Sequence, residues 1–338
     1  AQGEYSKALE YHEKSLEIYK KILPANHPDL ATSYNNIGLV YKNMGEYSKA
    51  LQYYEKSLEI SKQTLPGNHP DLATSYNNIG LVYNTMGEYS KALEYHEKSL
   101  EIREQILPTN HPSLAASYNN IGLVYDSMGK YSKALEYYQK SLDISKQTLP
   151  ANHPLLATSY NNIGWMYNVM GEYSKALEYY EKSLEIYKKT LPENHPDLAT
   201  SYNNIGLVYN NKGEYSTALE YYKKDLEIRK KTLPANHPSL ATSYNNIGLV
   251  YNSMSEYSKA LEYCERSLEI YRKAFPGNHP DLATSYNSIA WVYRNTTDYK
   301  KALDYYELAF DIWQRSLPSN HQNIQNVKQS IDFVKKKL

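Results

Sequence analysis

The sequence has few of the features that mark nucleic-acid-binding, membrane-spanning or disulfide-stabilised proteins. Its 338 residues carry 37 lysines and arginines against 37 aspartates and glutamates, so a polyanionic partner has no electrostatic basis. No stretch approaches the roughly 18 apolar residues of a membrane-spanning helix. The single cysteine, Cys264, cannot form an internal disulfide, which is typical of a reducing compartment. We therefore expect a cytoplasmic protein that binds neither nucleic acid nor membrane.

Proline and glycine are confined to positions that recur every 42 residues. All 15 prolines fall in two registers, one running from Pro24 to Pro318 and the other from Pro28 to Pro280. Most of the 14 glycines follow the same spacing. Eight such units account for almost the whole chain, so the sequence predicts one repeated unit rather than separate globular domains.

Each unit has the pattern of two helices. In the unit from 68 to 108, His69-Pro70-Asp71 favours the start of a helix over about 71–86, because proline is tolerated at the first helical position. We name this helix A. Gly87 ends it, and helix B follows over about 89–106 until Pro108 prevents continuation. Apolar residues three or four apart indicate helices, and the central Gly80 predicts a close approach of helix B.

The two ends of the chain depart from this pattern. Residues 1–24 correspond to a helix B without its helix A, and we interpret them as part of a truncated first repeat in a piece of a longer protein. Residues 25–320 form seven 42-residue units. Residues 321–338 have one apolar side and are predicted to be a C-terminal capping helix.

The repeated residues resemble the tetratricopeptide repeat signature. In one unit they are Tyr34, Ile37, Gly38, Tyr41, Gly45, Tyr47, Ala50, Leu51, Tyr54 and Leu58. Tyrosine replaces the first tryptophan of the signature, and Ser57 replaces a late alanine. The usual unit has about 34 residues, whereas the longer unit and the linker LPxNHPxLA are similar to those of the kinesin light chain. The resemblance covers essentially the whole chain.

This resemblance implies an all-α fold, a right-handed α-solenoid of stacked antiparallel helix pairs. Helices A would line a concave groove and helices B would lie outside. Proteins of this kind are generally not enzymes and bind extended peptides or partner helices. The resemblance therefore implies a non-catalytic scaffold with a protein or peptide partner, and we expect a monomer without a cofactor.

The helical periodicity predicts which residues face the groove. With Tyr34, Ile37 and Tyr41 turned toward the core, the opposite side of helix A carries Thr32, Asn35 and Leu39. The asparagine row is Asn35, Asn77, Asn119, Asn161, Asn203, Asn245 and Asn287. An amide side chain offers a donor and an acceptor, so this row could pair with the backbone of an extended peptide. The alternative is that these asparagines bond between adjacent helices.

A second row supplies apolar surface beside the amides. It consists of Leu39, Leu81, Leu123, Trp165, Leu207, Leu249 and Trp291. An exposed apolar strip of this kind often marks a binding site. For Trp165 and Trp291, filling of space left by a neighbour is an equally good interpretation. A further row consists of Lys42, Asn84, Asp126, Asn168, Asn210, Asn252 and Arg294. Lys42 and Arg294 are the only cations in the predicted rows, which argues against the acidic ligands that some family members bind through lysine and arginine.

No pattern of residues indicates catalysis or metal binding. Eight histidines from His27 to His321 recur once per unit, and we interpret them as structural residues at helix starts. Successive linkers are about 10 Å apart, too far for one histidine per unit to close a metal site. Two alternatives to a peptide-binding scaffold remain. One is a structural or consensus-like array without a dedicated ligand, and the other is the regulatory repeat region of a larger signalling or enzymatic protein.

Overall fold

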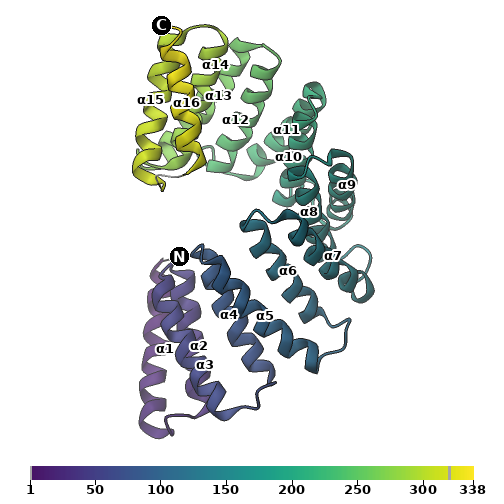
Figure 1. The fold of residues 1–338 in the computed structure, drawn as a ribbon, viewed down its shortest axis with the longest axis vertical. Helices are drawn as coiled ribbons and strands as arrows, with labels where there is room; N and C mark the ends of the chain where they lie inside the picture. The colour runs from purple at the N-terminus through teal and green to yellow at the C-terminus, as the bar shows by residue number, and fades with distance from the viewer. Residues whose placement is uncertain (1, 319–320) are drawn as a thin grey trace. The chain divides into compact units, whose positions relative to one another are not determined.

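All regular secondary structure in the described residues, 2–318 and 321–338, is α-helical in the computed structural model (Figure 1). The helices are α1 (Gln2–Ile22), α2 (Pro28–Asn43), α3 (Tyr47–Thr64), α4 (Pro70–Thr85), α5 (Tyr89–Ile106), α6 (Pro112–Ser127), α7 (Tyr131–Thr148), α8 (Pro154–Val169), α9 (Tyr173–Thr190), α10 (Pro196–Asn211), α11 (Tyr215–Thr232), α12 (Pro238–Ser253), α13 (Tyr257–Ala274), α14 (Pro280–Asn295), α15 (Tyr299–Ser316) and α16 (Gln322–Lys335). None of these helices combines the length and apolar character that crossing a bilayer requires.

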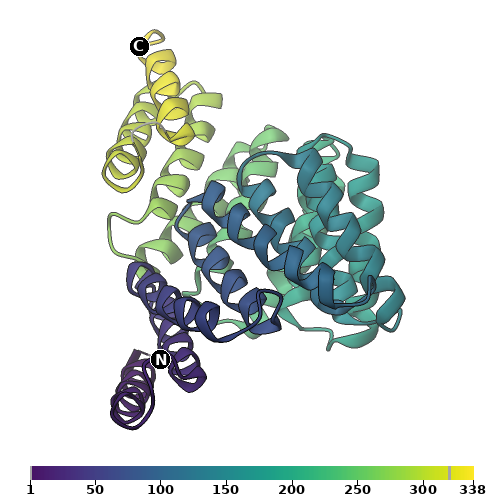
Figure 2. The ribbon, with the colours of Figure 1, turned by 60° about the horizontal axis from the view of Figure 1, so that its bottom comes forward.

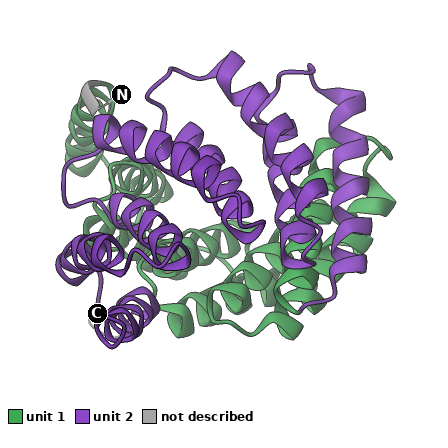
Figure 3. Ribbon diagram, turned by 90° about the horizontal axis from the view of Figure 1, so that it is seen from above, with its two compact units in different colours: residues 1–170 green, residues 171–338 purple. Residues whose placement is uncertain are grey.

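The chain divides into two compact units, residues 1–170 and residues 171–338 (Figure 3). Unit 1 contains α1 to α8, and unit 2 contains α9 to α16. Within each unit, a helix A packs against the helix B that follows it, and that helix B packs against the next helix A (Figures 1 and 2). The all-α solenoid of stacked antiparallel helix pairs that the sequence predicts is confirmed.

Each helix A begins at the histidine of the linker. His69 has an extended backbone, and its Nδ1 accepts a hydrogen bond from the backbone N–H of Asp71 at 3.2 Å. Pro70 occupies the first helical position, where a missing N–H costs nothing. The same cap recurs at all eight linker histidines. Their predicted structural role is confirmed, and the helix starts at Pro70, one residue before the predicted Asp71.

Most helices A end at a residue with positive φ. Gly45 has φ of 79°, and the next residue, Glu46, donates its backbone N–H to the carbonyl of Tyr41 at 2.9 Å. This six-residue loop is the Schellman motif, in which glycine is favoured because it has no Cβ to clash. In the last two copies, Ser255 and Thr297 adopt φ of 61° and 62° at this position.

The central glycine of helix A makes room for an aromatic ring of helix B. A Cβ built on Gly38 would lie 2.8 Å from Cδ1 of Tyr54, which is too close for an undisturbed contact. The predicted close approach is confirmed, and the group that approaches is the ring. Tyr53, the neighbour of Tyr54, stacks on Tyr41 with ring centroids 5.3 Å apart. The same contact recurs in later repeats, where Tyr95, Tyr137, Tyr221 and Tyr305 stack on the second tyrosine of helix A.

Candidate peptide-binding surface

The predicted asparagine and leucine rows lie on one side of the helices A together with a threonine row, which consists of Thr32, Thr74, Ala116, Thr158, Thr200, Thr242 and Thr284. Thr32 is exposed and Asn35 is half-buried, whereas Ile37 and Tyr41 on the other side of α2 are buried. In the other helices A the counterpart of Thr32 is exposed and that of Ile37 is buried, whereas the counterpart of Tyr41 is buried or half-buried and Asn245 is buried. We name the side that carries the threonine, asparagine and leucine rows the asparagine surface. Each unit has its own asparagine surface, formed by α2, α4, α6 and α8 in unit 1 and by α10, α12 and α14 in unit 2.

The leucine and tryptophan row presents apolar side chains to solvent. Leu39 is 45% exposed, Trp165 39% and Trp291 37%, and Leu123 is exposed to a similar degree. The other members, Leu81, Leu207 and Leu249, are half-buried. Large apolar groups exposed beside polar ones are available to a binding partner.

The asparagine row is tied from each repeat to the next. The Oδ1 atom of Asn35 accepts a hydrogen bond from Nδ2 of Asn78, the second asparagine of the following repeat, at 3.0 Å. Three further pairs have the same geometry, namely Asn77 with Asn120 at 2.9 Å, Asn119 with Asn162 at 3.1 Å and Asn203 with Asn246 at 2.8 Å. Each oxygen therefore holds two adjacent helices A together. Within the described residues, the Nδ2 groups of these four acceptors donate no hydrogen bond.

The seventh repeat interrupts this series. Ser288 stands where the other repeats have their second asparagine, and its hydroxyl donates to the carbonyl of Thr284 instead. The Oδ1 atom of Asn245 is consequently buried without a hydrogen-bond partner in the described part of the chain. Asn161 has an interaction partner, and Asn287 is half-buried.

The sequence left two interpretations of these asparagines open, namely pairing with the backbone of a peptide and bonding between adjacent helices. The doublet Asn-Asn in every repeat up to Asn245-Asn246 was the available signal, because two amides one position apart can bridge to the corresponding pair of an adjacent copy. The repeat-to-repeat bonds agree with the structural alternative for these residues. They engage the Oδ1 atoms of Asn35, Asn77, Asn119 and Asn203 and not their Nδ2 groups.

Trp165 is held in place from the preceding repeat. Its indole N–H donates a hydrogen bond to the carboxylate of Asp126 on α6. Burial raises the pKa of Asp126, and the hydrogen bond from Trp165 opposes that rise. The indole of Trp165 thus interacts with Asp126 and remains 39% exposed.

The asparagine surface has few cations that are free to pair with a ligand. The guanidinium of Arg294 lies 4.2 Å from the ring centroid of Phe333, so it is engaged in a cation–π contact. Arg294 also forms a hydrogen bond with Tyr306. This leaves Lys42 as the other basic member of its row, and it is half-buried.

The described residues contain no group of three or more histidine, cysteine, aspartate or glutamate side chains that could hold a metal ion. The buried Cys264 packs at Gly248, and burial raises the pKa of its thiol to about 12. A thiol with this pKa is almost entirely protonated at neutral pH and is a poor nucleophile.

The stacked helix pairs form an α-solenoid, and the repeated sequence of the pairs identifies the family of the chain. The chain matches the family described as Tetratricopeptide repeat over residues 1–63, 34–105, 71–147, 113–189, 155–231, 197–273 and 239–315. These overlapping matches cover most of the chain, so it belongs to the tetratricopeptide repeat family. No curated protein matches it.

Solved structures show the same fold. The nearly identical TPR-like repeats of a putative kinesin light chain from Podosopora anserina are 27% identical, with a TM-score of 0.54 over 61% of this chain and 98% of that chain. BtubC from P. vanneervenii is 21% identical, with a TM-score of 0.57 over 69% and 91%. The apo form of the quorum sensor NprR from B. thuringiensis is 21% identical, with a TM-score of 0.71 over 91% and 83%. The predicted similarity to kinesin light chain repeats is confirmed.

Proposed function

We propose that this chain is a non-catalytic scaffold that binds an extended peptide segment of a partner protein on its asparagine surface. The observation that carries the proposal is the row of amide N–H groups left without a partner in the described part of unit 1, at Asn35, Asn77 and Asn119, beside exposed leucine and tryptophan side chains. Backbone carbonyls of an extended peptide are acceptors that match these donors whatever the peptide's side chains.

Affinity would come from many weak contacts. One hydrogen bond contributes about 1 kcal/mol net, so three or four reach only a weak complex. Apolar burial against Leu39, Leu123 and Trp165 supplies the rest. With few free cations on this surface, we expect affinity to change little between low and high salt.

The test separates the amide donor from the amide acceptor. Asn119→Asp keeps an oxygen for the hydrogen bond from Asn162 but removes the N–H group offered to a peptide. A library of extended peptides is screened against the chain, and hits are titrated against this variant and against Asn77→Asp. We expect several-fold weaker binding in each variant.

Gln105→Glu is the matched control, because it makes the same amide-to-acid change at an exposed position of α5, outside the asparagine surface. Peptides that bind the two aspartate variants and the control equally well would locate binding elsewhere. A library without hits would favour the array without a dedicated ligand.

A further inference from the structure

One position in helix B decides whether the space between successive repeats is filled. Counting along the 42-residue register, this position holds Tyr19, Ser61, Arg103, Ser145, Tyr187, Arg229, Tyr271 and Trp313. We name it the filling position. Six copies have a large side chain there, and Ser61 and Ser145 are the two small ones.

Where the filling residue is arginine, its guanidinium is connected to the next helix A, directly at Arg103 and through Asp225 at Arg229. Nη1 of Arg103 donates to Oγ of Ser117 at 2.6 Å and to the carbonyl of Ser113 at 3.3 Å. In unit 2, Nε of Arg229 donates to the buried carboxylate of Asp225 at 2.5 Å. Ser243, which corresponds to Ser117, donates its hydroxyl to the other oxygen of that carboxylate. Ser117 thus accepts a hydrogen bond from a guanidinium directly, whereas Ser243 bonds to the carboxylate that holds one.

Where the filling residue is tyrosine, the ring occupies the same space. Tyr271 is 6% exposed, and its hydroxyl lies 2.9 Å from Oγ1 of Thr242. Thr242 belongs to the threonine row of the asparagine surface. A filling side chain therefore extends from helix B to the edge of that surface.

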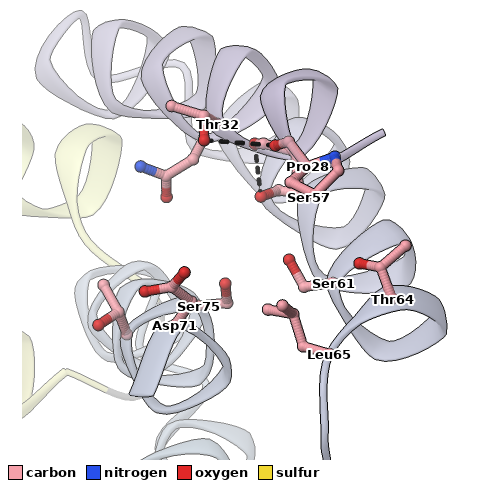
Figure 4. A pocket seen from close by; sticks show the side chains of 11 residues that line it. Pro28, Thr32, Ser57, Ser61, Thr64, Leu65, Asp71 and Ser75 are labelled. Carbon is pink, nitrogen blue, oxygen red and sulfur yellow. Dashed lines mark hydrogen bonds between the residues drawn. The ribbon is translucent and has the colours of Figure 1, made fainter. Parts of the chain in front are cut away.

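At Ser61 the corresponding space is open. A cavity of about 200 Å³ lies between α2, α3 and α4 (Figure 4). Figure 4 shows Ser57 and Ser61 of α3 and Asp71 and Ser75 of α4 around the same space. Thr32, Asn35 and Thr74 also line it, so the cavity opens at the asparagine surface.

The polar groups that hold Arg103 have counterparts in this cavity. Ser75 corresponds to Ser117, and the carbonyl of Asp71 corresponds to that of Ser113. Asp71 adds a carboxylate, the one charged side chain among the lining residues, and it is exposed at the rim. At Ser145, the residue equivalent to Asp71 is Leu155, so that copy lacks the negative charge.

We propose that the cavity at Ser61 is a specificity pocket for the guanidinium side chain of an arginine in the bound peptide. This inference rests on the proposed function, because the peptide on the asparagine surface delivers the arginine. The arginine side chain of the peptide would occupy the space that corresponds to the one filled by Arg103 in the next repeat. Arginine fits better than lysine, because its planar group can donate to Ser75 and to the Asp71 carbonyl together.

The first arm of the test uses methylguanidinium alone, so that it does not depend on peptide binding. The full chain is titrated with methylguanidinium and with methylammonium while the backbone amide resonances of Asp71 and Ser75 are followed by NMR. We expect methylguanidinium to shift both resonances more than methylammonium does. In Ser61→Tyr, which copies the filling residue of Tyr271, the response should disappear.

The second arm uses peptide hits that contain arginine, each paired with the same peptide carrying citrulline at that position. We expect Ser61→Tyr to weaken the arginine peptide about tenfold and the citrulline peptide much less. Ser61→Arg, which copies Arg103, should act in the same way and guards against misfolding of one variant. Gln52→Tyr, at an exposed position of α3, is the control for an added ring.

The two arms separate this inference from the proposed function. Peptides that lose affinity in Asn119→Asp but bind Ser61→Tyr and Ser61→Arg normally would overturn the pocket and leave the scaffold intact. A methylguanidinium response that Ser61→Tyr abolishes, in a chain that binds no peptide, would leave the pocket and overturn the scaffold. Equal responses to the two small cations would also overturn the pocket.

Discussion

In the helix pair of α4 and α5, histidine replaces tyrosine at a buried position. His96 corresponds to Tyr54 and Tyr138, and it is 1% exposed against Gly80. Neither ring nitrogen has a hydrogen-bond partner in the described residues. Burial, together with the positive charge of Arg103, lowers the pKa of His96 from 6.5 to about 4. The folded chain therefore holds this side chain neutral at pH values where the unfolded chain protonates it.

We predict that this histidine makes the chain less stable in mild acid. Between pH 6.5 and pH 4 the unfolded state binds the extra proton, so the free energy of unfolding falls as the pH falls, by up to about 3 kcal/mol. His96→Tyr should remove this part of the loss and restore the packing seen at Gly38 and Tyr54. Urea denaturation of the parent and of His96→Tyr at pH 7 and pH 4.5 measures how much stability each protein loses in acid. Equal losses in both would contradict the prediction.

Among the elements, the helices A differ in how well their ends suit the backbone. The position that has positive φ is glycine in the earlier repeats but Ser255 at the end of α12 and Thr297 at the end of α14. A β-branched residue is strained there, because its Cβ approaches the carbonyl oxygen. The turn itself is kept, since Asp298 still donates its N–H to the carbonyl of Tyr293 at 3.0 Å.

Replacing the strained residue should stabilise unit 2. We expect Thr297→Gly to raise the free energy of unfolding by about 1 kcal/mol, because relief of strain exceeds the entropy that glycine loses on folding. Thr296→Gly is the matched control, since Thr296 has φ of −85° and should lose stability when changed to glycine. Thermal unfolding compares the melting temperatures of the parent and the two variants, and we expect Thr297→Gly to melt highest and Thr296→Gly lowest. A Thr297→Gly protein that melts below the parent would refute the strain.

The sequence determined the helices well because their signals are local. His69-Pro70 and Gly87 lie within one turn of the helix ends that they specify, so the predicted bounds differ from the structure by a single residue. The central Gly80 predicted a close contact between helices A and B, but the sequence pattern could not identify the ring that makes this contact. That identity depends on the angle between helices A and B, which packing sets.

At the scale of the whole molecule, stability depends on contacts between successive repeats. In a solenoid each repeat touches only its neighbours, so the interface terms add along the chain. The amide pairs, such as Asn203 with Asn246 at 2.8 Å, are one such term. Asn245 lacks it, because Ser288 does not reach its oxygen, and the unpaired atom is buried.

We predict that Ser288→Asn restores the missing contact. A new hydrogen bond to Oδ1 of Asn245 should add about 1 kcal/mol or more to the free energy of unfolding, since it also satisfies a buried acceptor. The converse change, Asn246→Ser, removes the partner of Asn203 and should cost a similar amount. Chemical denaturation of both variants measures the two effects. If both variants raised, or both lowered, the free energy of unfolding, the stabilising role of the asparagine pairs would be contradicted.

The candidate site was only partly predictable, because some of its features depend on contacts between successive repeats. Periodicity placed Asn35, Leu39 and Trp165 on one exposed side, because the helix fixes their directions. It could not show that the oxygen of Asn35 meets Asn78, or that the space beside Ser61 stays open. Both depend on how far one repeat is displaced along the next, which no single unit encodes.

The amide bridges also bear on how the copies can diverge. The oxygen belongs to one copy and the nitrogen to the next, so the harm from a replacement such as Ser288 falls on a different copy from the one that mutated. Selection should therefore conserve the first asparagine of a repeat together with the second asparagine of the following repeat. A gene duplication that adds a whole copy supplies both residues and so creates a new pair.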